Sequence, residues 1–187
     1  MANVVVFNTV SLDGFFTDVQ GDMSWAHSPD EEWQRFTEEN ARGGGTLFMG
    51  RVTYDLMVRF WPTPAAARSF PAVAELMNSL QKVVFSRTLE TVSWKNTRLA
   101  KGEPVAEVRK LKQESGNDMV ILGSGSVVSQ LTDAGLVDEY QFVLYPIILG
   151  KGRTMFEGVT KKLALELTRT RSFRNGNVLL CYKPLNA

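Results

Sequence analysis

The stretch Met119-Val-Ile-Leu-Gly-Ser-Gly-Ser-Val-Val-Ser-Gln-Leu131 joins a short apolar run to a segment of helical spacing through four small residues. This order predicts a strand, a tight turn and a helix. In such a turn, glycines let the backbone approach an anion, and the N–H groups of the first helical turn point toward it. The turn is shorter than G-x-G-x-x-G and lacks the lysine of a P-loop. It therefore indicates either a phosphate site or an ordinary helix cap.

Segments of the same two kinds alternate along most of the chain. The strand-like runs cover residues 4–9, 46–49, 82–86, 119–122 and 139–144, and the helical segments between them cover residues 29–40, 53–60, 71–80, 104–114 and 126–134. Pro29, Pro71 and Pro104 stand at the starts of three of these helices, where a missing N–H does no harm. Alternating strands and helices predict a largely parallel sheet that is covered on both faces.

The end of the chain follows a different pattern. Two more strand-like runs, residues 163–171 and 177–183, have no helix between them, and Arg174-Asn-Gly-Asn177 is a hairpin turn signal. The alternation predicts an inward side made of Leu163, Leu165 and Leu167 and an outward side made of Glu166 and Thr168. The expected fold is therefore α/β, with a mixed sheet that is parallel first and antiparallel at the C-terminal end, flanked by helices.

No linker, internal repeat or low-complexity tract divides the chain, so we expect residues 1–187 to form a single domain. The loosest stretch, residues 63–69, is expected to be a loop within it. With 21 basic and 20 acidic residues the net charge is +1, and nucleic acid is not an expected partner. No apolar run approaches the roughly 20 residues that cross a bilayer. The N-terminus lacks the basic region of a signal peptide, so the expected location is cytoplasmic.

The rarest residues exclude the most chemistry. The chain has one cysteine, Cys181, and one histidine, His27. An internal disulfide is impossible, and zinc sites built from histidine and cysteine, including those of zinc deaminases, lack ligands, so no metal is expected. Cys181 lies in an apolar run and is expected to be buried, and His27 is expected at the surface or in a cap. The chemistry must rest on carboxylates, hydroxyls, backbone groups or a cofactor.

Three predicted strand ends carry groups that suit phosphate. These are Gly50-Arg51-x-Thr53, Ser86-Arg87 and the turn from Gly123 to Ser126. In parallel α/β sheets ligands bind at the carboxyl ends of the strands, and the arginine fork favours phosphate oxygens. Together the three ends suit a ligand with two or three separated phosphates. Each also has a plain alternative: Thr53 caps its own helix, or Arg87 is a solvated charge.

A second cluster lies around the first predicted helix. Trp33 and Phe36 share one helix face, toward the core or a cleft. Ser28 and Glu31 have the spacing of a capping box, with Ser28 as N-cap, and the acids there complement the helix dipole. A carboxylate beside an aromatic cleft, here Asp30, is also suited to holding a protonated planar heterocycle. The sequence leaves both interpretations open.

The motifs, taken in order, resemble a known family. They are Ser11-Leu-Asp-Gly14, Met49-Gly-Arg-Val-Thr-Tyr54, Val84-Phe-Ser-Arg87, Ile121-Leu-Gly-Ser-Gly-Ser126 and Leu144-Tyr-Pro-Ile-Ile-Leu-Gly-Lys-Gly-Arg153. Over about residues 3–183 the chain resembles the dihydrofolate reductase-like superfamily. More closely, it is similar to the branch named after the C-terminal reductase domain of bacterial riboflavin-biosynthesis proteins. The resemblance implies an eight-stranded mixed sheet that binds NADPH across its strand ends.

The resemblance also implies roles for individual residues. The cofactor phosphates are expected at Gly50, Arg51 and Thr53, the adenosine 2′-phosphate at Ser86 and Arg87, the pyrophosphate at Gly123, Ser124, Gly125 and Ser126, and the nicotinamide near Thr9. Contact with the 2′-phosphate favours NADPH over NADH. Asp30 follows Trp25 by five positions, the spacing of the acid that protonates or orients the pterin in dihydrofolate reductases. A homodimer through the C-terminal strands is implied too, and residues 149–153 border either the substrate or the dimer contact.

The resulting functional hypothesis is an NADPH-dependent reductase acting on a small heterocyclic substrate. Its hydride acceptor is expected to be a pterin-like or pyrimidine-like nitrogen heterocycle, as in a dihydrofolate reductase or a 5-amino-6-(5-phosphoribosylamino)uracil reductase. The alternative is a nucleotide- or dinucleotide-binding protein without efficient reductase activity, because the three phosphate motifs look the same in both cases.

Overall fold

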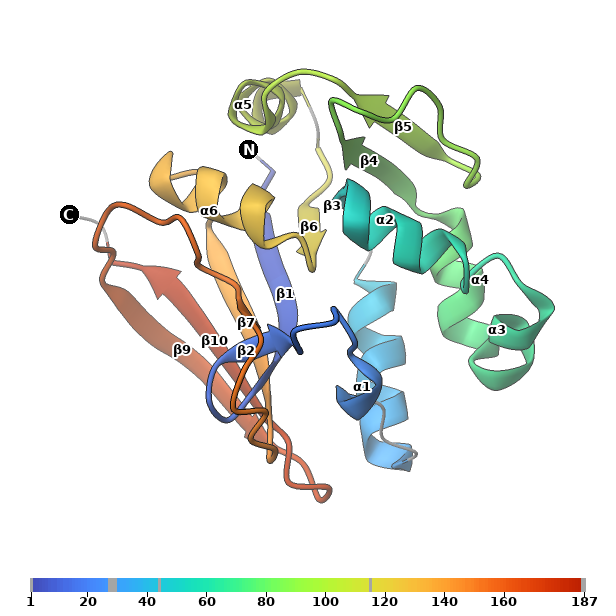
Figure 1. The fold of residues 1–187 in the computed structure, drawn as a ribbon, viewed down its shortest axis with the longest axis vertical. Helices are drawn as coiled ribbons and strands as arrows, with labels where there is room; N and C mark the ends of the chain where they lie inside the picture. The colour runs from blue at the N-terminus through green and yellow to red at the C-terminus, as the bar shows by residue number, and fades with distance from the viewer. Residues whose placement is uncertain (1, 27–29, 44, 115, 186–187) are drawn as a thin grey trace.

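The computed structural model describes residues 2–26, 30–43, 45–114 and 116–185. Its main sheet has the order β5-β4-β3-β6-β1-β7-β10-β9, and β2 and β8 form a separate two-stranded sheet (Figure 1). The strands are β1 (Val4–Ser11), β2 (Phe15–Thr17), β3 (Thr46–Gly50), β4 (Gln81–Phe85), β5 (Thr97–Ala100), β6 (Met119–Leu122), β7 (Glu139–Tyr145), β8 (Arg153–Thr154), β9 (Leu165–Ser172) and β10 (Val178–Pro184). The helices are η1 (Ser24–Ala26), α1 (Glu31–Arg42), α2 (Arg51–Val58), α3 (Pro64–Ser69), α4 (Pro71–Ser79), α5 (Pro104–Glu114) and α6 (Gly125–Asp133).

The strands from β5 to β7 in this order are parallel to one another, and β10 and β9 are antiparallel. The mixed sheet expected from the sequence is therefore confirmed. In β4, Val83, Val84 and Phe85 are all buried, although successive side chains point to opposite faces. A strand covered on both faces is apolar throughout, which is why these strands are visible in the sequence.

Helices cover both faces of the parallel part of the sheet. Val108 of α5 and Leu131 of α6 belong to one core cluster, on the face where Figure 1 shows these two helices together. Tyr54 of α2 and Met77 of α4 belong to a cluster on the other face. The aromatic residues of α1 form a third cluster against β7 and β10. The carboxyl ends of the parallel strands are thus held in fixed relative positions.

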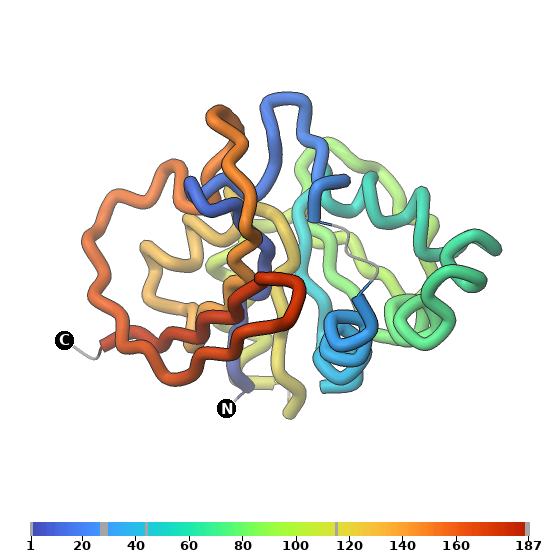
Figure 2. The backbone as a smooth tube through the Cα atoms, turned by 90° about the horizontal axis from the view of Figure 1, so that it is seen from below, coloured from blue at the N-terminus to red at the C-terminus, as the bar shows by residue number. Residues whose placement is uncertain are grey.

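The C-terminal hairpin corrects one prediction. Its turn is present, with Gly176 at φ 88° and a hydrogen bond from the Phe173 N–H to the Asn177 carbonyl. However, Leu163 is 38% and Leu167 50% exposed, so the predicted inward leucine side is wrong for these two residues. β9 is the last strand of the sheet, and residues 166–172 are all exposed. Figure 2 shows this hairpin at one side of the molecule and α3 and α4 at the other.

Several local expectations also change. Residues 64–69 form the short helix α3 rather than a loop, because Pro64 occupies its first turn and Thr63 accepts a hydrogen bond from the Ala66 N–H at 3.3 Å. α2 begins at Arg51, two residues before the predicted start. The N-cap of α1 is Asp30, not Ser28. His27, Ser28 and Pro29 lie outside the described residues.

In the described part of the chain, none of the helices has the length and apolar character to span a bilayer. The same residues contain no cluster of three or more histidine, cysteine, aspartate or glutamate side chains that could hold a metal ion. Cys181 is buried, as expected.

Candidate functional site

The three strand ends that the sequence singled out lie at one edge of the sheet. β3 pairs with β4 up to Gly50 and Phe85, and with β6 up to Phe48 and Ile121. Because these three strands are adjacent and parallel, the residues that follow them come out side by side. The geometry therefore brings together Gly50, Ser86 and the turn that starts at Gly123, which lie far apart in the sequence.

Ser124 joins two of these strand ends directly. Its buried hydroxyl accepts a hydrogen bond from the Gly50 N–H at 2.8 Å. The same oxygen lies 3.0 Å from the Thr53 hydroxyl and 2.9 Å from the Leu122 carbonyl, to either of which it can donate. Ser124 therefore ties the start of α2 to the start of α6. Thr53 is not the N-cap of its helix, because that position belongs to Gly50.

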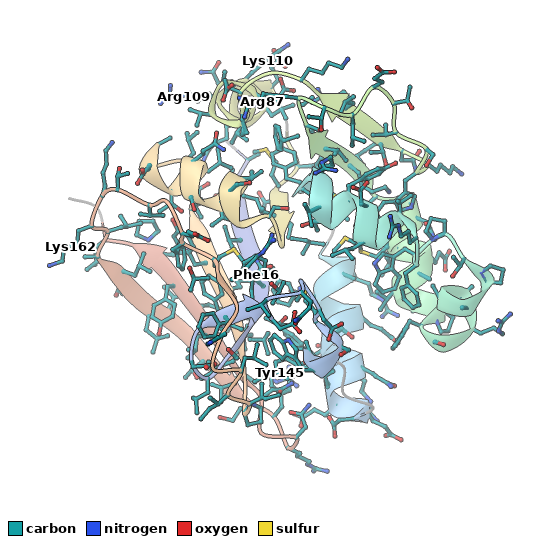
Figure 3. All side chains as sticks on the ribbon, viewed as in Figure 1. Phe16, Arg87, Arg109, Lys110, Tyr145 and Lys162 are labelled. Carbon is teal, nitrogen blue, oxygen red and sulfur yellow. The ribbon has the colours of Figure 1, made fainter. Side chains whose placement is uncertain are left out.

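Gly123 is required by the packing of the protein itself, and Gly125 is tightly surrounded. Gly123 has φ 56°, and a Cβ atom there would lie 2.6 Å from the Thr53 hydroxyl. A Cβ on Gly125 would lie 3.3 Å from the Met155 carbonyl and 3.6 Å from the ring of Phe16, which is labelled in Figure 3. What the turn offers a ligand is therefore its backbone, not empty space left by missing side chains.

Two helix N-termini meet at this edge. The amides of Gly125 and Ser126, the first two residues of α6, have no acceptor among the described residues, and the first amides with one are those of Val127 and Val128, which donate to the Ser124 carbonyl. The N-cap of α2, Gly50, supplies no side-chain acceptor for that helix either. Unpaired N–H groups and the helix dipoles make both ends favourable for negative charge.

Cationic and hydroxyl groups flank these helix ends. Arg51, at the start of α2, is half exposed and makes a loose ion pair with Asp55 at 3.7 Å. Arg87 follows β4 and is exposed, and in the view of Figure 3 it lies beside α5 with Arg109 and Lys110. The Ser86 hydroxyl accepts from the Leu89 N–H at 3.0 Å, so it also orders the loop that carries Arg87.

Asn8 is a site residue that the sequence analysis missed. It lies in β1, is 5% exposed, and its Oδ1 accepts the Gly123 N–H at 2.6 Å. The only signal for it in the sequence is a polar residue within the apolar run of the first strand. Thr9, the next residue, pairs with Val143 of β7 and is partly exposed near the end of β1.

The aromatic cluster lies on the α1 face of the sheet. Trp33 and Phe36 share a face of α1, as predicted, and both are buried. Trp25 and Trp33 each meet the Tyr145 ring edge to face, at 5.6 and 5.8 Å between centroids. The Tyr145 hydroxyl donates to the Ala26 carbonyl at 2.6 Å, and burial raises its pKa to about 12. The buried Trp25 Nε1–H has no acceptor among the described residues.

Asp30 caps the helix that carries this cluster. Its Oδ1 accepts the Trp33 N–H at 2.9 Å, which is the N-cap arrangement. The sequence placed Asp30 near the start of this helix but assigned the cap to Ser28. Asp30 thus already has one structural task, as the cap of α1.

Asp13 anchors the loop that follows β7. It accepts hydrogen bonds from the Ser11 hydroxyl at 2.6 Å and from the Leu149 and Gly150 N–H groups at 3.2 and 2.7 Å. The Ser11 hydroxyl is the main reason why its pKa is lowered. The Ser11-Leu-Asp-Gly14 motif and the glycine-rich loop of residues 149–153 are therefore two halves of one contact, which links the ends of β1 and β7.

The sheet order and this edge define the class of the molecule: a dihydrofolate reductase-like α/β protein. Among solved structures, the chain is similar to a putative riboflavin biosynthesis protein from Shewanella sp. PV-4, with a TM-score of 0.75, 24% identity and 100% of both chains covered. It is also similar to dihydrofolate reductase from Enterococcus faecalis complexed with NADP(H), with a TM-score of 0.65, 16% identity and 98% and 97% of the two chains covered.

Within this class the chain belongs to the family of RibD C-terminal domains, whose model matches residues 2–179. The chain is also similar in sequence to the uncharacterized protein YyaP of Bacillus subtilis (strain 168). It is 28% identical over 180 residues, which cover 96% of this chain and 93% of YyaP.

Proposed function

We propose that this protein is an NADPH-dependent reductase of a planar nitrogen heterocycle, pterin-like or pyrimidine-like. The observation that carries the proposal is the Ser124 hydroxyl, which bonds to the Gly50 N–H and lies 3.0 Å from the Thr53 hydroxyl. This contact fixes two helix N-termini beside each other, and adjacent N-termini suit the two phosphates of a dinucleotide better than one isolated anion.

The chain's groups at this edge fit that cofactor. The free amides of Gly125 and Ser126, with the start of α2, face the pyrophosphate in this proposal. Arg51 and Arg87 are exposed cations for the remaining phosphate charge, with Arg87 and Ser86 assigned to the 2′-phosphate. Thr9, near the end of β1, borders the nicotinamide. When bound, NADPH supplies the hydride, and the protein supplies position and electrostatics.

We assign the heterocycle to the region where α1 begins. The unpaired Trp25 Nε1–H is a buried donor that a carbonyl oxygen or an ordered water can satisfy. Asp30 lies at the start of α1, where its carboxyl group holds or delivers a proton to a ring nitrogen. In this proposal, the Trp25 donor and the Asp30 acid serve the mixed donor and acceptor edge of a pterin or pyrimidine.

The second candidate function is a dinucleotide-binding protein without efficient reductase activity. The hydrogen bond by which Asp30 caps α1 favours this candidate, because the cap alone explains why an aspartate stands at this position, without a role in proton transfer. Both candidates share the cofactor edge and differ only at the substrate end.

The proposal is tested by titrating the protein with NADPH and NADH, and by screening heterocycles for oxidation of the reduced cofactor. Arg87→Ala should weaken NADPH binding by about 10- to 100-fold, because a hydrogen bond to a charged group contributes about 1.5–3 kcal/mol. NADH affinity should stay nearly unchanged, since NADH lacks the 2′-phosphate. Equal losses for both cofactors contradict the assignment, and NADPH binding without turnover of any heterocycle favours the second candidate.

We also propose that two copies pair through the C-terminal hairpin. β9 is an edge strand with exposed residues throughout 166–172, and Leu163 and Leu167 add apolar surface beside it. Unprotected edges of this kind are usually covered in soluble proteins.

A further inference from the structure

We propose that Asn8 is a positioning residue of the cofactor site: its side-chain amide holds the Gly123 peptide so that the first amides of α6 face the pyrophosphate. The inference rests on the proposed function, and it assigns a task to a residue outside the three phosphate motifs. Asn8 lies in β1, in the middle of the sheet, and is almost completely buried.

The contact between Asn8 and Gly123 is two-sided. Asn8 Oδ1 accepts the Gly123 N–H at 2.6 Å, and Nδ2 lies 3.4 Å from the Gly123 carbonyl and 3.6 Å from the Met155 sulfur. The orientation of the amide is unambiguous, because only its oxygen can accept from an N–H group. Both backbone polar groups of Gly123, one from each of the peptide units that flank its Cα, are therefore engaged by one side chain.

The position of Gly123 explains why a side chain has to do this. The parallel ladder between β1 and β6 ends at the pair Phe7 and Leu122, so no backbone of β1 is paired with Gly123. A buried peptide group without a partner costs about 1–3 kcal/mol. An amide carries one donor and one acceptor side, like a peptide, so Asn8 extends the ladder by one residue. A carboxylate lacks the donor and an aliphatic side chain lacks both.

The peptide that Asn8 holds determines the direction of the turn. Gly123 and Ser124 both have left-handed backbone angles, with φ 56° and 62°, and Ser124 is an uncommon residue for that region. Two such residues in succession turn the chain from β6 into α6. Asn8 holds the turn from the β1 side, and the Ser124 hydroxyl, bonded to the Gly50 N–H, holds it from the β3 side. Loss of either tie releases the Gly125 and Ser126 amides from their common direction.

This arrangement predicts a selective loss. Without the Asn8 amide, the folded protein should bind NADPH about tenfold more weakly, because the turn has to be ordered on binding. Ser86 and Arg87 are separate from Asn8. They follow β4, whereas Asn8 lies in β1, and two strands, β3 and β6, lie between β4 and β1 in the sheet. Adenosine 2′-phosphate, which lacks the pyrophosphate, should bind unchanged.

The experiment compares wild type, Asn8→Ala and Asn78→Ala by calorimetric titration with NADPH and with adenosine 2′-phosphate, at a temperature where circular dichroism shows all three folded. Asn78 is the matched control. Its amide also makes two hydrogen bonds, from Trp94 Nε1 at 2.7 Å and to the Trp61 carbonyl at 2.9 Å. It lies at the end of α4, just before β4 begins, and hence at the opposite edge of the sheet.

The expected result is lower thermal stability in both variants but weaker NADPH binding only in Asn8→Ala. If Asn8→Ala does not fold, Asn8→Ser, which keeps a hydroxyl at this position, takes its place. NADPH affinity of the Asn8 variant within about twofold of wild type overturns the inference and leaves the proposed function intact. Parallel losses for NADPH and adenosine 2′-phosphate overturn it too, since they indicate general loosening. A wild-type protein that binds neither nucleotide overturns the proposed function, and the inference falls with it.

Discussion

Ser124 is a residue whose side chain and backbone have separate tasks. The sequence analysis assigned it to the pyrophosphate, but its hydroxyl is used inside the protein, between the Gly50 N–H and the Thr53 hydroxyl. Only the backbone that follows it remains for a ligand. A serine in a Gly/Ser turn looks the same in the sequence in either case, because the difference depends on which strand lies beside the turn.

Ser124→Ala should therefore lower both stability and cofactor affinity. The substitution leaves the partly buried Gly50 N–H without its acceptor, which costs about 1 kcal/mol or more of unfolding free energy. Denaturant unfolding monitored by tryptophan fluorescence measures this loss. Ser126→Ala is the control, because Ser126 is exposed and its change should stay within about 0.5 kcal/mol. Equal stabilities of the two variants contradict the role given to the Ser124 hydroxyl.

Asp30 can be tested without disturbing its cap. Asparagine is as good an N-cap as aspartate, so Asp30→Asn should change stability by less than about 0.5 kcal/mol while it removes the carboxyl group. Asp30→Ala, which loses the cap as well, should cost about 0.5–2 kcal/mol. If Asp30 serves the proton transfer, both variants lose turnover with little change in NADPH affinity. Full turnover in Asp30→Asn would exclude Asp30 from proton transfer and leave capping of α1 as its role.

At the scale of elements, the strands that the sequence predicted best are the most apolar ones, such as β4, which is buried on both faces, and β6, which is buried on one face and partly buried on the other. Their apolar runs can be recognised in the sequence without knowing which strands lie beside them in the sheet. β5, β2 and β8 were missed because they are short and, like Phe15–Thr17 against Arg153 and Thr154, are defined by pairing with a distant segment. The leucines of β9 were misplaced for a similar reason: alternation indicates which residues share a side, but not whether anything covers it.

The start of β4 carries a buried charge, beside the end of α4, with a measurable pH effect. Lys82 is 1% exposed and donates to the Met77 and Leu80 carbonyls at 2.8 and 2.6 Å. Burial lowers the pKa of Lys82 to about 8, from 10.5 in an exposed lysine. Between these values the unfolded chain holds the proton and the folded protein does not, so the unfolding free energy should rise as the pH increases from about 8 to 10.5.

The rise attributable to Lys82 should reach about 3 kcal/mol at most, and denaturant unfolding at a series of pH values measures it. Lys82→Met, which keeps the length of the side chain and removes the titration, is the control and should abolish this part of the slope. Identical slopes in the two proteins exclude Lys82 as the cause.

At the scale of the whole molecule, the family and the sheet followed from the order of motifs, whereas the contacts that assemble the edge did not. The Ser124 tie runs over 74 residues, and the Asp13 contacts to residues 149 and 150 over 136 and 137. No local pattern reports a contact at that separation. The sequence could propose that three strand ends share a ligand, but the residues holding those ends together became visible only in the fold.

The proposed twofold pairing also belongs to this scale. Leu167→Arg places a charge on the exposed apolar surface of β9 and should convert a dimer to a monomer, as measured by light scattering coupled to size-exclusion chromatography. Val19→Arg is the control, because Val19 is 57% exposed and lies outside the hairpin. A dimer that survives Leu167→Arg is assembled through another surface, and a monomeric wild type contradicts the pairing altogether.

The place of β1 has a consequence for the newly synthesised chain. Among the strands of this sheet, β1 leaves the ribosome first; it lies between β6 and β7, and its Asn8 contacts a glycine 115 residues further along. At roughly 5–20 residues per second, the N-terminal strand waits on the order of ten seconds for its neighbours. During that interval its apolar side chains have no native partner, so the nascent protein depends on whatever shields them. If the proposed cofactor site is correct, NADPH binding by a stalled nascent chain would mark the length at which β1, β3, β4 and β6 have assembled.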